Sequence, residues 1–167
     1  MITFRSFVLA SAIGTSLPAL AGDQPSVRVE PPATQGPRQL QEQTAKAAIQ
    51  DYLDSWRTMS KALDENRPDL LDRDFTGAAR EKLAATIKDQ STAGIHAFYR
   101  DTSHDVQVLF YSPEGLSIEL ADTVQYEAQL FNRDKSIGNE QVRTRYIVVL
   151  TPSETRWRVR IFQAENQ

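Results

Sequence analysis

The chain has 167 residues, a formal net charge of −3 and no cysteine. The missing cysteine excludes disulfide bonds, thiolate metal sites and a lipidated N-terminal cysteine. A mildly acidic chain without a basic run is also a poor candidate for binding nucleic acid, because that binding is driven by neutralising phosphates.

The first 21 residues have the three-part pattern of a cleavable export signal. Arg5 and the free amino group precede an apolar, uncharged run over residues 7–17. Ala19 and Ala21 supply the small-x-small pattern that a signal peptidase requires, so we expect cleavage after Ala21. The run has about 11 residues, against roughly 20 for a membrane-spanning helix; an uncleaved N-terminal anchor is the alternative. The sequence predicts export by the general secretory route to the periplasm or the extracellular space, without a stable membrane anchor.

Residues 22–39 form a proline-rich stretch that is too polar to fold alone. Its prolines stand among Ser, Gln, Gly and Arg, at Pro25, Pro31, Pro32 and Pro37. We expect an extended spacer here, followed by a single domain over residues 40–167. The alternative to an inert spacer is a tether or a tail that binds a partner.

Two helices are expected at the start of the domain. Residues 41–65 carry apolar side chains at spacings of three and four, which predicts one long helix with a single apolar stripe. The stripe consists of Ala45, Ala48, Ile49, Tyr52, Leu53, Trp56, Met59 and Leu63. Residues 78–92 predict a second helix that ends at Gly94. Between the two, Pro68 ends the first helix or opens a short one.

After His104 the apolar period changes to two, which predicts strands. The expected strands cover residues 105–110, 116–131, 142–150 and 157–161, with a polar loop at 133–139. Segregated helices and strands indicate an α+β fold. We expect the N-terminal helices to pack in the concave face of a strongly curved antiparallel sheet, which makes a cone with a pocket at its open end.

Matching the apolar faces of neighbouring strands gives an expected register, because a slip of one residue would expose the apolar set to water. The pairs expected on the inner face are Leu150 with Trp157, Val148 with Val159, Tyr146 with Ile161, Tyr126 with Tyr146, and Leu130 with Val142. On the outer face Glu127 then lies opposite Arg145. Asp122 falls within the apolar face of its strand, where we interpret it as a bulge or bend residue.

Four segments together resemble the nuclear transport factor 2-like superfamily. They are residues 48–56 (AIQDYLDSW), 70–75 (LLDRDF), 145–150 (RYIVVL) and 155–159 (TRWRV). The resemblance covers about residues 42–163. It is greatest to non-catalytic members, such as the C-terminal domain of cyanobacterial and chloroplast division proteins of the accumulation-and-replication-of-chloroplasts type.

The resemblance implies either chemistry inside the cone or the use of the cone and sheet for protein contacts, and fold alone cannot choose between these. In the isomerase-type members a carboxylate base works with a Tyr hydroxyl. Tyr52 resembles that tyrosine, and Asp74 is the nearest base by order along the chain, with a core tyrosine and a loop or cap carboxylate as the alternatives. The sheet offers no convincing catalytic carboxylate, so no catalytic residue is assigned.

Neither metal nor cofactor binding is expected. His96 and His104 lie eight residues apart across an expected helix-to-strand turn, without a metal-ligand spacing. His96, Tyr99 and Arg100 form an alternative ligand or peptide site at the mouth of the cone.

Two sets of residues are candidates for binding. One set, converging on the interior, is either an aromatic core or the lining of a pocket for a small apolar ligand: Tyr52, Trp56, Tyr99, Tyr126 and Tyr146. The other set mixes apolar and Arg side chains on the outer sheet face, a composition that suits a protein interface: Arg145, Ile147, Val149, Arg158 and Arg160. The leading hypothesis is an exported, non-enzymatic domain that binds a protein partner or itself, and the alternative is a small-molecule binder or an isomerase-type enzyme that uses the cone.

Overall fold

The computed structural model describes residues 24–33 and 38–165, and the expected export signal lies outside them. The elements are β1 (Ser26–Val29), α1 (Glu42–Asp64), the 3-10 helix η1 (Pro68–Arg73), α2 (Gly77–Ala93), β2 (Ile95–Tyr111), β3 (Ile118–Asn132), β4 (Lys135–Pro152) and β5 (Trp157–Ala164). The strands form one sheet in the order β1-β2-β3-β4-β5. β1 runs parallel to β2, and the other neighbours are antiparallel.

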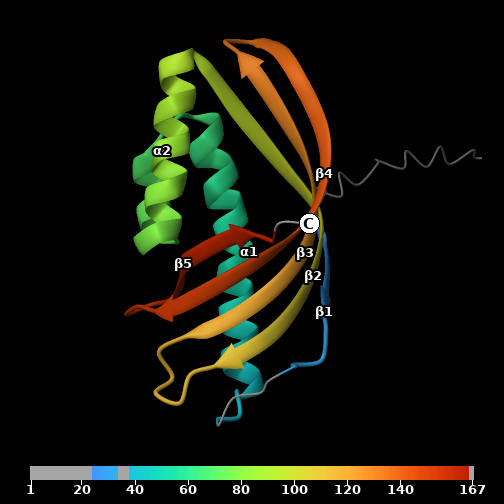
Figure 1. Cartoon of the computed structure of the whole chain (residues 1–167), viewed down its shortest axis with the longest axis vertical. Coiled ribbons are helices and arrows are strands. Elements are labelled where there is room, and N and C mark those ends of the chain that lie inside the picture. The colour runs from blue at the N-terminus through green and yellow to red at the C-terminus, as the bar shows by residue number, and fades with distance from the viewer. Residues whose placement is uncertain (1–23, 34–37, 166–167) are drawn as a thin grey trace, which may run out of the picture.

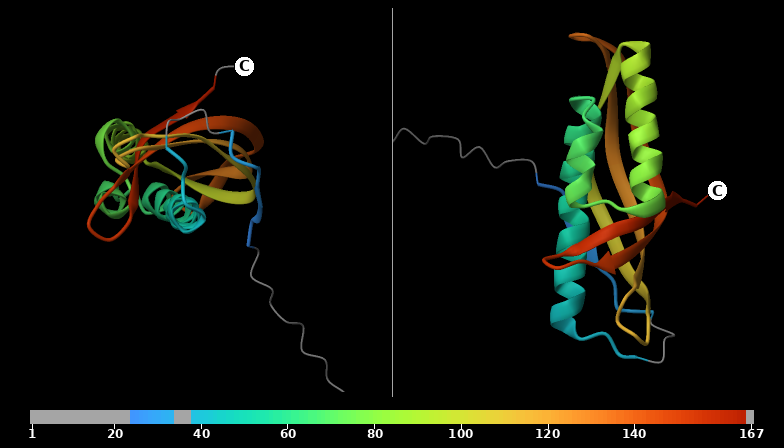
Figure 2. Two further views of the ribbon diagram at one scale, coloured as in Figure 1. Left: turned by 90° about the horizontal axis from the view of Figure 1, so that it is seen from below. Right: turned by 90° about the vertical axis from the view of Figure 1, so that its left-hand side faces the viewer.

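The sheet is long and strongly curved, and both helices lie on its concave side (Figures 1 and 2). This arrangement confirms the expected α+β cone. Among the described residues, no helix is long and apolar enough to cross a membrane.

α1 buries the predicted apolar stripe against the sheet. Its largest buried side chains are Tyr52, Trp56, Met59 and Leu63, each at most 2% exposed. A 3.6-residue period places these positions on one face, so a single helix can fill the length of the cone. α2 lies beside α1 and ends at Gly94, whose φ of 68° is the left-handed conformation that stops a helix.

The inner face of the sheet alternates as predicted, with Val106, Val108, Leu120, Val148 and Leu150 all buried. The start of β2 was predicted wrongly, however. β2 begins directly after α2, at Ile95, so residues 95–104 are strand and not a turn. Polar residues occupy most of its first half, and a bulge between Asp101 and Ser103 interrupts the period there.

The hairpin between β3 and β4 is tighter than expected. β4 starts at Lys135, and Arg133 adopts a positive φ of 53° in the turn, so residues 133–139 are not a loop. Their polarity reflects an exposed hairpin tip. The tighter turn moves the register by four residues.

The observed partners of β3 therefore differ from the expected ones. Tyr126 pairs with Val142, Leu130 with Gly138 and Asp122 with Tyr146, while Glu127 lies opposite Gln141 and not Arg145. A shift of four keeps every side chain on its expected face.

The register of β5 was also predicted wrongly. Leu150 pairs with Val159, Pro152 with Trp157, Val148 with Phe162 and Tyr146 with Ala164, with an irregularity between Val149 and Leu150. The extra residue lets the ring of Phe162 turn inward, where it stacks on Tyr146 at 4.3 Å between ring centroids.

The proline-rich segment contributes a strand to the sheet. Within residues 22–39, which were expected to be a spacer, β1 pairs with residues 103–106 of β2. Two further contacts extend this pairing: the N–H of Glu30 donates to the carbonyl of Val106 at 2.8 Å, and the N–H of Ala33 donates to the carbonyl of Val108 at 3.0 Å. The first described segment is thereby fixed to the edge of the sheet.

Candidate functional site

A chain of four polar side chains runs through the core between α1 and the sheet. The hydroxyl of Tyr52 donates to Oδ2 of Asp122 at 2.7 Å. Nδ1 of His104 lies 2.7 Å from the same oxygen, and its Nε2 lies 3.1 Å from Oδ2 of Asp101. The side chains of His104 and Asp122 are 0% exposed, whereas that of Asp101 is 17% exposed.

The two carboxylates set the charge of His104. Burial opposes protonation, but the hydrogen bonds and charges of Asp101 and Asp122 outweigh it and raise the pKa of His104 to about 9. His104 is therefore an imidazolium at neutral pH, held between two carboxylates. Burial, followed by the charge of Asp122, raises the pKa of Tyr52 well above its usual value, so this hydroxyl stays protonated.

Chemically, this chain of hydrogen bonds could pass a proton from Asp101 to the interior. Catalysis would further require a substrate atom within about 3 Å of one of these groups, and the inner members have no exposed surface. Two buried polar atoms of this region, Nε1 of Trp56 and Oδ1 of Asp122, have no hydrogen-bond partner.

The structure places the predicted pocket aromatics side by side. The ring of Trp56 lies 5.6 Å from that of Tyr126 and 5.8 Å from that of Tyr146, and the ring of Tyr99 lies 5.2 Å from that of Tyr126. The hydroxyls of Tyr126 and Tyr146 are 3.4 Å apart. Tyr52 is brought to the same region through its bond to Asp122 and its edge contact with His104. These rings pack on one another inside the cone.

Asp74 does not join Tyr52, as the isomerase-type arrangement would require. Its carboxylate, in a residue 1% exposed, accepts from the Thr58 hydroxyl and pairs with the Arg156 guanidinium. Its backbone carbonyl accepts from the N–H of Val159 at 2.8 Å. Asp74 thus ties α1 and the end of η1 to β5.

The predicted interface residues are divided between two environments. Arg145 pairs with Glu165, and Ile147 and Val149 are half-buried on β4. Arg158 instead donates to the backbone carbonyls of Asp72 and Phe75, and Arg160 lies against Gly77 at the start of α2. The last two therefore contact the helical layer.

The two histidines lie on β2, where the sequence predicted a turn. His96 stacks on Phe131 with ring centroids 5.1 Å apart, and its Nδ1 lies 2.9 Å from Oδ1 of Asp64. Within residues 24–33 and 38–165 no group of three or more His, Asp or Glu side chains could hold a metal ion.

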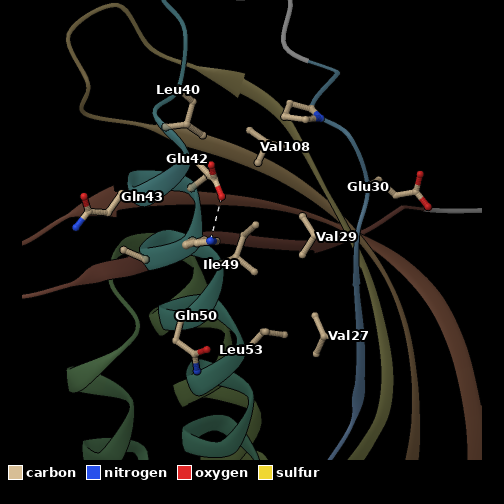
Figure 3. Close-up of a pocket in the computed structure, with 14 residues that line it drawn as sticks. Val27, Val29, Glu30, Leu40, Glu42, Gln43, Ile49, Gln50, Leu53 and Val108 are labelled. Atoms are coloured by element: carbon tan, nitrogen blue, oxygen red, sulfur yellow. Dashed lines mark ion pairs between the residues drawn. The ribbon is translucent and has the colours of Figure 1, made fainter.

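An apolar groove lies between β1 and the N-terminal half of α1 (Figure 3). Its volume is about 950 Å³, at the upper end of the range of roughly 300–1,000 Å³ that is usual for ligand sites. Val27 and Val29 project from β1 toward the helix, and Ile49 and Leu53 project from α1 toward the strand. The groove is therefore walled by aliphatic side chains on both sides.

A few further residues border the groove. Leu40 and Val108 line it as well, and on its helix side Glu42 and Lys46 form an exposed ion pair of 3.0 Å along α1. None of the described side chains with an unpartnered buried polar atom lines the groove. Its interior thus favours apolar groups.

A polar cleft of about 510 Å³ continues along the C-terminal half of α1. Arg57 and Lys61 line it from the helix, and Tyr99, Arg100 and Asp101 line it from β2. Asp101 is the link between this cleft and the buried His104.

Sequence reasoning missed the groove because one wall belongs to the segment that was expected to be a spacer. The alternation of Val27 and Val29 with Arg28 and Glu30 is the signal that could have predicted a strand there. The pairing of His104 with Asp122 was missed as well, although both residues are in phase with the apolar inner positions of their strands.

The architecture defines the chain as a cone-shaped α+β domain with the nuclear transport factor 2-like fold, which confirms the fold that the resemblance in the sequence implied. A crystal structure of the intermembrane space region of the chloroplast protein ARC6 is similar, with a TM-score of 0.63 at 12% identity, covering 78% of this chain and 100% of that one. The protein Kfla4162 of Kribbella flavida matches with a TM-score of 0.50 at 13% identity, over 72% of this chain and 90% of that one.

A candidate scytalone dehydratase from Novosphingobium aromaticivorans has a TM-score of 0.51 at 11% identity, over 75% of this chain and 89% of that one. No protein-family model matches the sequence, and no curated protein is significantly similar to it. At these identities the comparisons establish the fold.

Proposed function

We propose that this chain is an exported, non-enzymatic binding domain that takes an apolar segment of a partner protein into the groove between α1 and β1. The observation that carries the proposal is the position of the apolar concavity. It lies at the edge of the core, between Val27 and Val29 on one side and Ile49 and Leu53 on the other.

The filled interior of the cone supports a non-enzymatic role. Trp56, Tyr126 and Tyr146 pack ring against ring, and the ionisable groups beside them bond to one another. An enzyme of the isomerase type needs a base and a hydroxyl donor that both reach the substrate. Here Tyr52 donates to Asp122, which itself has no exposed surface.

The composition of the groove supports a protein partner. Val27 is 44% and Val29 is 54% exposed, which leaves aliphatic surface in water beside a concave floor. Exposed apolar surface rimmed by charged residues is typical of interaction sites. The groove is open to solvent, so an extended chain can enter it.

A pair of leucine variants tests this proposal. Leu53→Lys places a charge in the groove, while Leu116→Lys makes the same change at a loop leucine that is 61% exposed and lies outside the groove. A photo-crosslinker at Gln50, on the groove, first identifies the partner in producing cells, with a crosslinker at Lys88 on α2 as the control. Binding of that purified partner is then measured by titration.

We expect Leu53→Lys to weaken binding at least about tenfold, because a leucine buried in an interface contributes roughly 1.5–3 kcal/mol. Leu116→Lys should bind like the unaltered chain. Equal binding by both variants would refute the groove as the site. If the purified chain instead releases a stoichiometric small apolar molecule into organic solvent, the small-ligand alternative is correct.

A further inference from the structure

The free edge of β1 carries backbone groups that point away from the sheet. β1 is the first strand in the sheet order, and no other described strand pairs with its far side. The N–H of Glu30 points toward β2, where it donates to the carbonyl of Val106. Because successive residues of a strand alternate, the N–H and C=O groups of Val27 and Val29 point outward.

Prolines limit the length of this edge. Pro25 and Pro31 flank β1 on either side and lack an N–H, and the carbonyl of Pro31 accepts a hydrogen bond from the Gln107 side chain of β2 at 3.1 Å. Natural edge strands are commonly shortened in this way, which prevents open-ended aggregation. The edge of β1 can therefore accept only one short strand.

Two opposite charges stand next to the valines on the other face of β1. Nε of Arg28 donates to Oδ1 of Asp105 at 2.7 Å, and an Nη2 atom of Arg28 lies 3.2 Å from Glu30. The side chain of Arg28 is 69% exposed and that of Glu30 is 39% exposed. Although they already pair within the chain, both side chains keep exposed surface that a second chain at the edge can contact.

We propose that the partner at this edge is a second copy of the chain, paired antiparallel through β1 with Val29 opposite Val29. The proposal follows from comparing the registers that match outward-pointing groups on both copies. Val27 opposite Val27 would put Arg28 against Ser26 and pair no charges. Val27 opposite Val29 would put Arg28 against Arg28, and Val29 opposite Pro31 would put Glu30 against Glu30. Like charges directly opposite each other are destabilising.

Only the register centred on Val29 pairs unlike charges. It places Arg28 of each copy opposite Glu30 of the other, twice by symmetry, and it lets the two Val29 residues exchange both backbone hydrogen bonds. A twofold arrangement of this kind uses the same surface on both copies, which closes the dimer.

The resulting dimer is small. Its seam has a few backbone hydrogen bonds, two charge pairs and the valines that face the groove, so its dissociation constant is expected on the order of 0.1 mM. The two apolar grooves lie on either side of the seam. Pairing at the edge of β1 does not depend on what occupies the groove.

Charge exchange tests both the edge and the register. Arg28→Glu and Glu30→Arg each create two like-charge pairs in a homodimer, so each variant alone should sediment as a monomer at concentrations where the unaltered chain dimerises. In an equimolar mixture, a copy carrying Arg28→Glu can pair with a copy carrying Glu30→Arg. Both charge pairs across the seam are then between unlike charges, so the mixture should dimerise again.

Matched controls separate the effect from a general change of charge. Glu114→Arg and Lys88→Glu make the same charge changes at exposed positions away from β1 and should leave the dissociation constant unchanged. Circular dichroism and thermal unfolding establish that each variant is folded.

Amide hydrogen exchange gives a second reading on the unaltered chain. The N–H of Val29 should become protected as the concentration rises to about 1 mM, while the N–H of Glu30, bonded to β2, should be protected at every concentration. An unaltered chain that stays monomeric at that concentration overturns the proposal, and so does a mixture of the two variants that fails to dimerise.

Discussion

The buried imidazolium of His104 makes the stability of the fold depend on pH in a window where few other groups titrate. The pKa of His104 is raised from 6.5 to about 9 by Asp101 and Asp122, against the opposing effect of burial. A pKa that is higher in the folded than in the unfolded chain means that protonation stabilises the fold. The contribution of His104 is therefore fully present below about pH 6.5 and is lost as the pH rises through about 9.

The magnitude follows from the two pKa values. At 1.36 kcal/mol for each pH unit, the change from 6.5 to about 9 corresponds to a loss of about 3 kcal/mol in the free energy of unfolding. This is a large part of the stability of an ordinary domain, about 5–15 kcal/mol. The side chain of His104 has no exposed surface, so its charge is stabilised by Asp101 and Asp122 and not by water.

Urea unfolding between pH 6 and pH 10 measures this loss. Up to about pH 9 few other groups titrate, because the chain has no cysteine and only one other histidine, His96; above that pH the tyrosines and lysines of the unfolded chain also begin to lose protons. His104→Gln serves as the reference, since a glutamine has no charge to lose over the range. If the unaltered chain and His104→Gln lose the same stability between pH 6.5 and pH 9, His104 is not the titrating group and the reasoning fails.

Three further substitutions test the partners of His104 and the end of α2. Asp122→Asn leaves the buried His104 with one carboxylate, and removing one partner of a buried pair costs about 3–5 kcal/mol, so urea unfolding should show a loss of that size in the free energy of unfolding. Asp101→Asn should cause a smaller loss, because Asp101 is partly exposed. Equal losses for the two variants would contradict the hydrogen-bond network described above. Gly94→Ala should lower the free energy of unfolding by only about 1 kcal/mol. The φ of Gly94 is +68°, which strains an alanine, but a Cβ there meets nothing within 4 Å. A loss above about 3 kcal/mol in thermal unfolding would show a steric clash instead.

The sequence could predict the parts of the fold that depend on periodicity. A 3.6-residue stripe of large side chains defined α1, and alternation defined β3, β4 and the inner face of the sheet. The side chains that point to the inner face were predicted correctly even where the register was wrong, because a shift of β4 by four residues leaves each side chain on the same face. Periodicity does not determine turn length, so the tight turn at Arg133 could not be read from the polar residues around it.

The candidate site was harder to predict because it depends on contacts between distant segments. The strand β1 has only four residues, and its prolines and charges indicate a spacer as readily as an edge strand. The groove forms only where β1 meets α1, so no pattern within one short segment of the sequence predicts it. The same holds for His104 and Asp122, which are 18 residues apart on neighbouring strands.

The hydrogen bonds among the buried side chains of Tyr52, Asp122 and His104 help to specify one arrangement of the long strands. Inner-face alternation alone would tolerate a slip of two residues between β2 and β3, because such a slip keeps apolar residues inside. A slip that placed Asp122 opposite Val108 would break the hydrogen bond between Asp122 and His104, and the loss of one partner of a buried pair is destabilising. The hydroxyl of Tyr52 adds α1 to the same register. We interpret these hydrogen bonds as fixing the position of β2 relative to β3 and α1. Because β1 pairs with β2, they also fix the position of the strand that forms one wall of the groove.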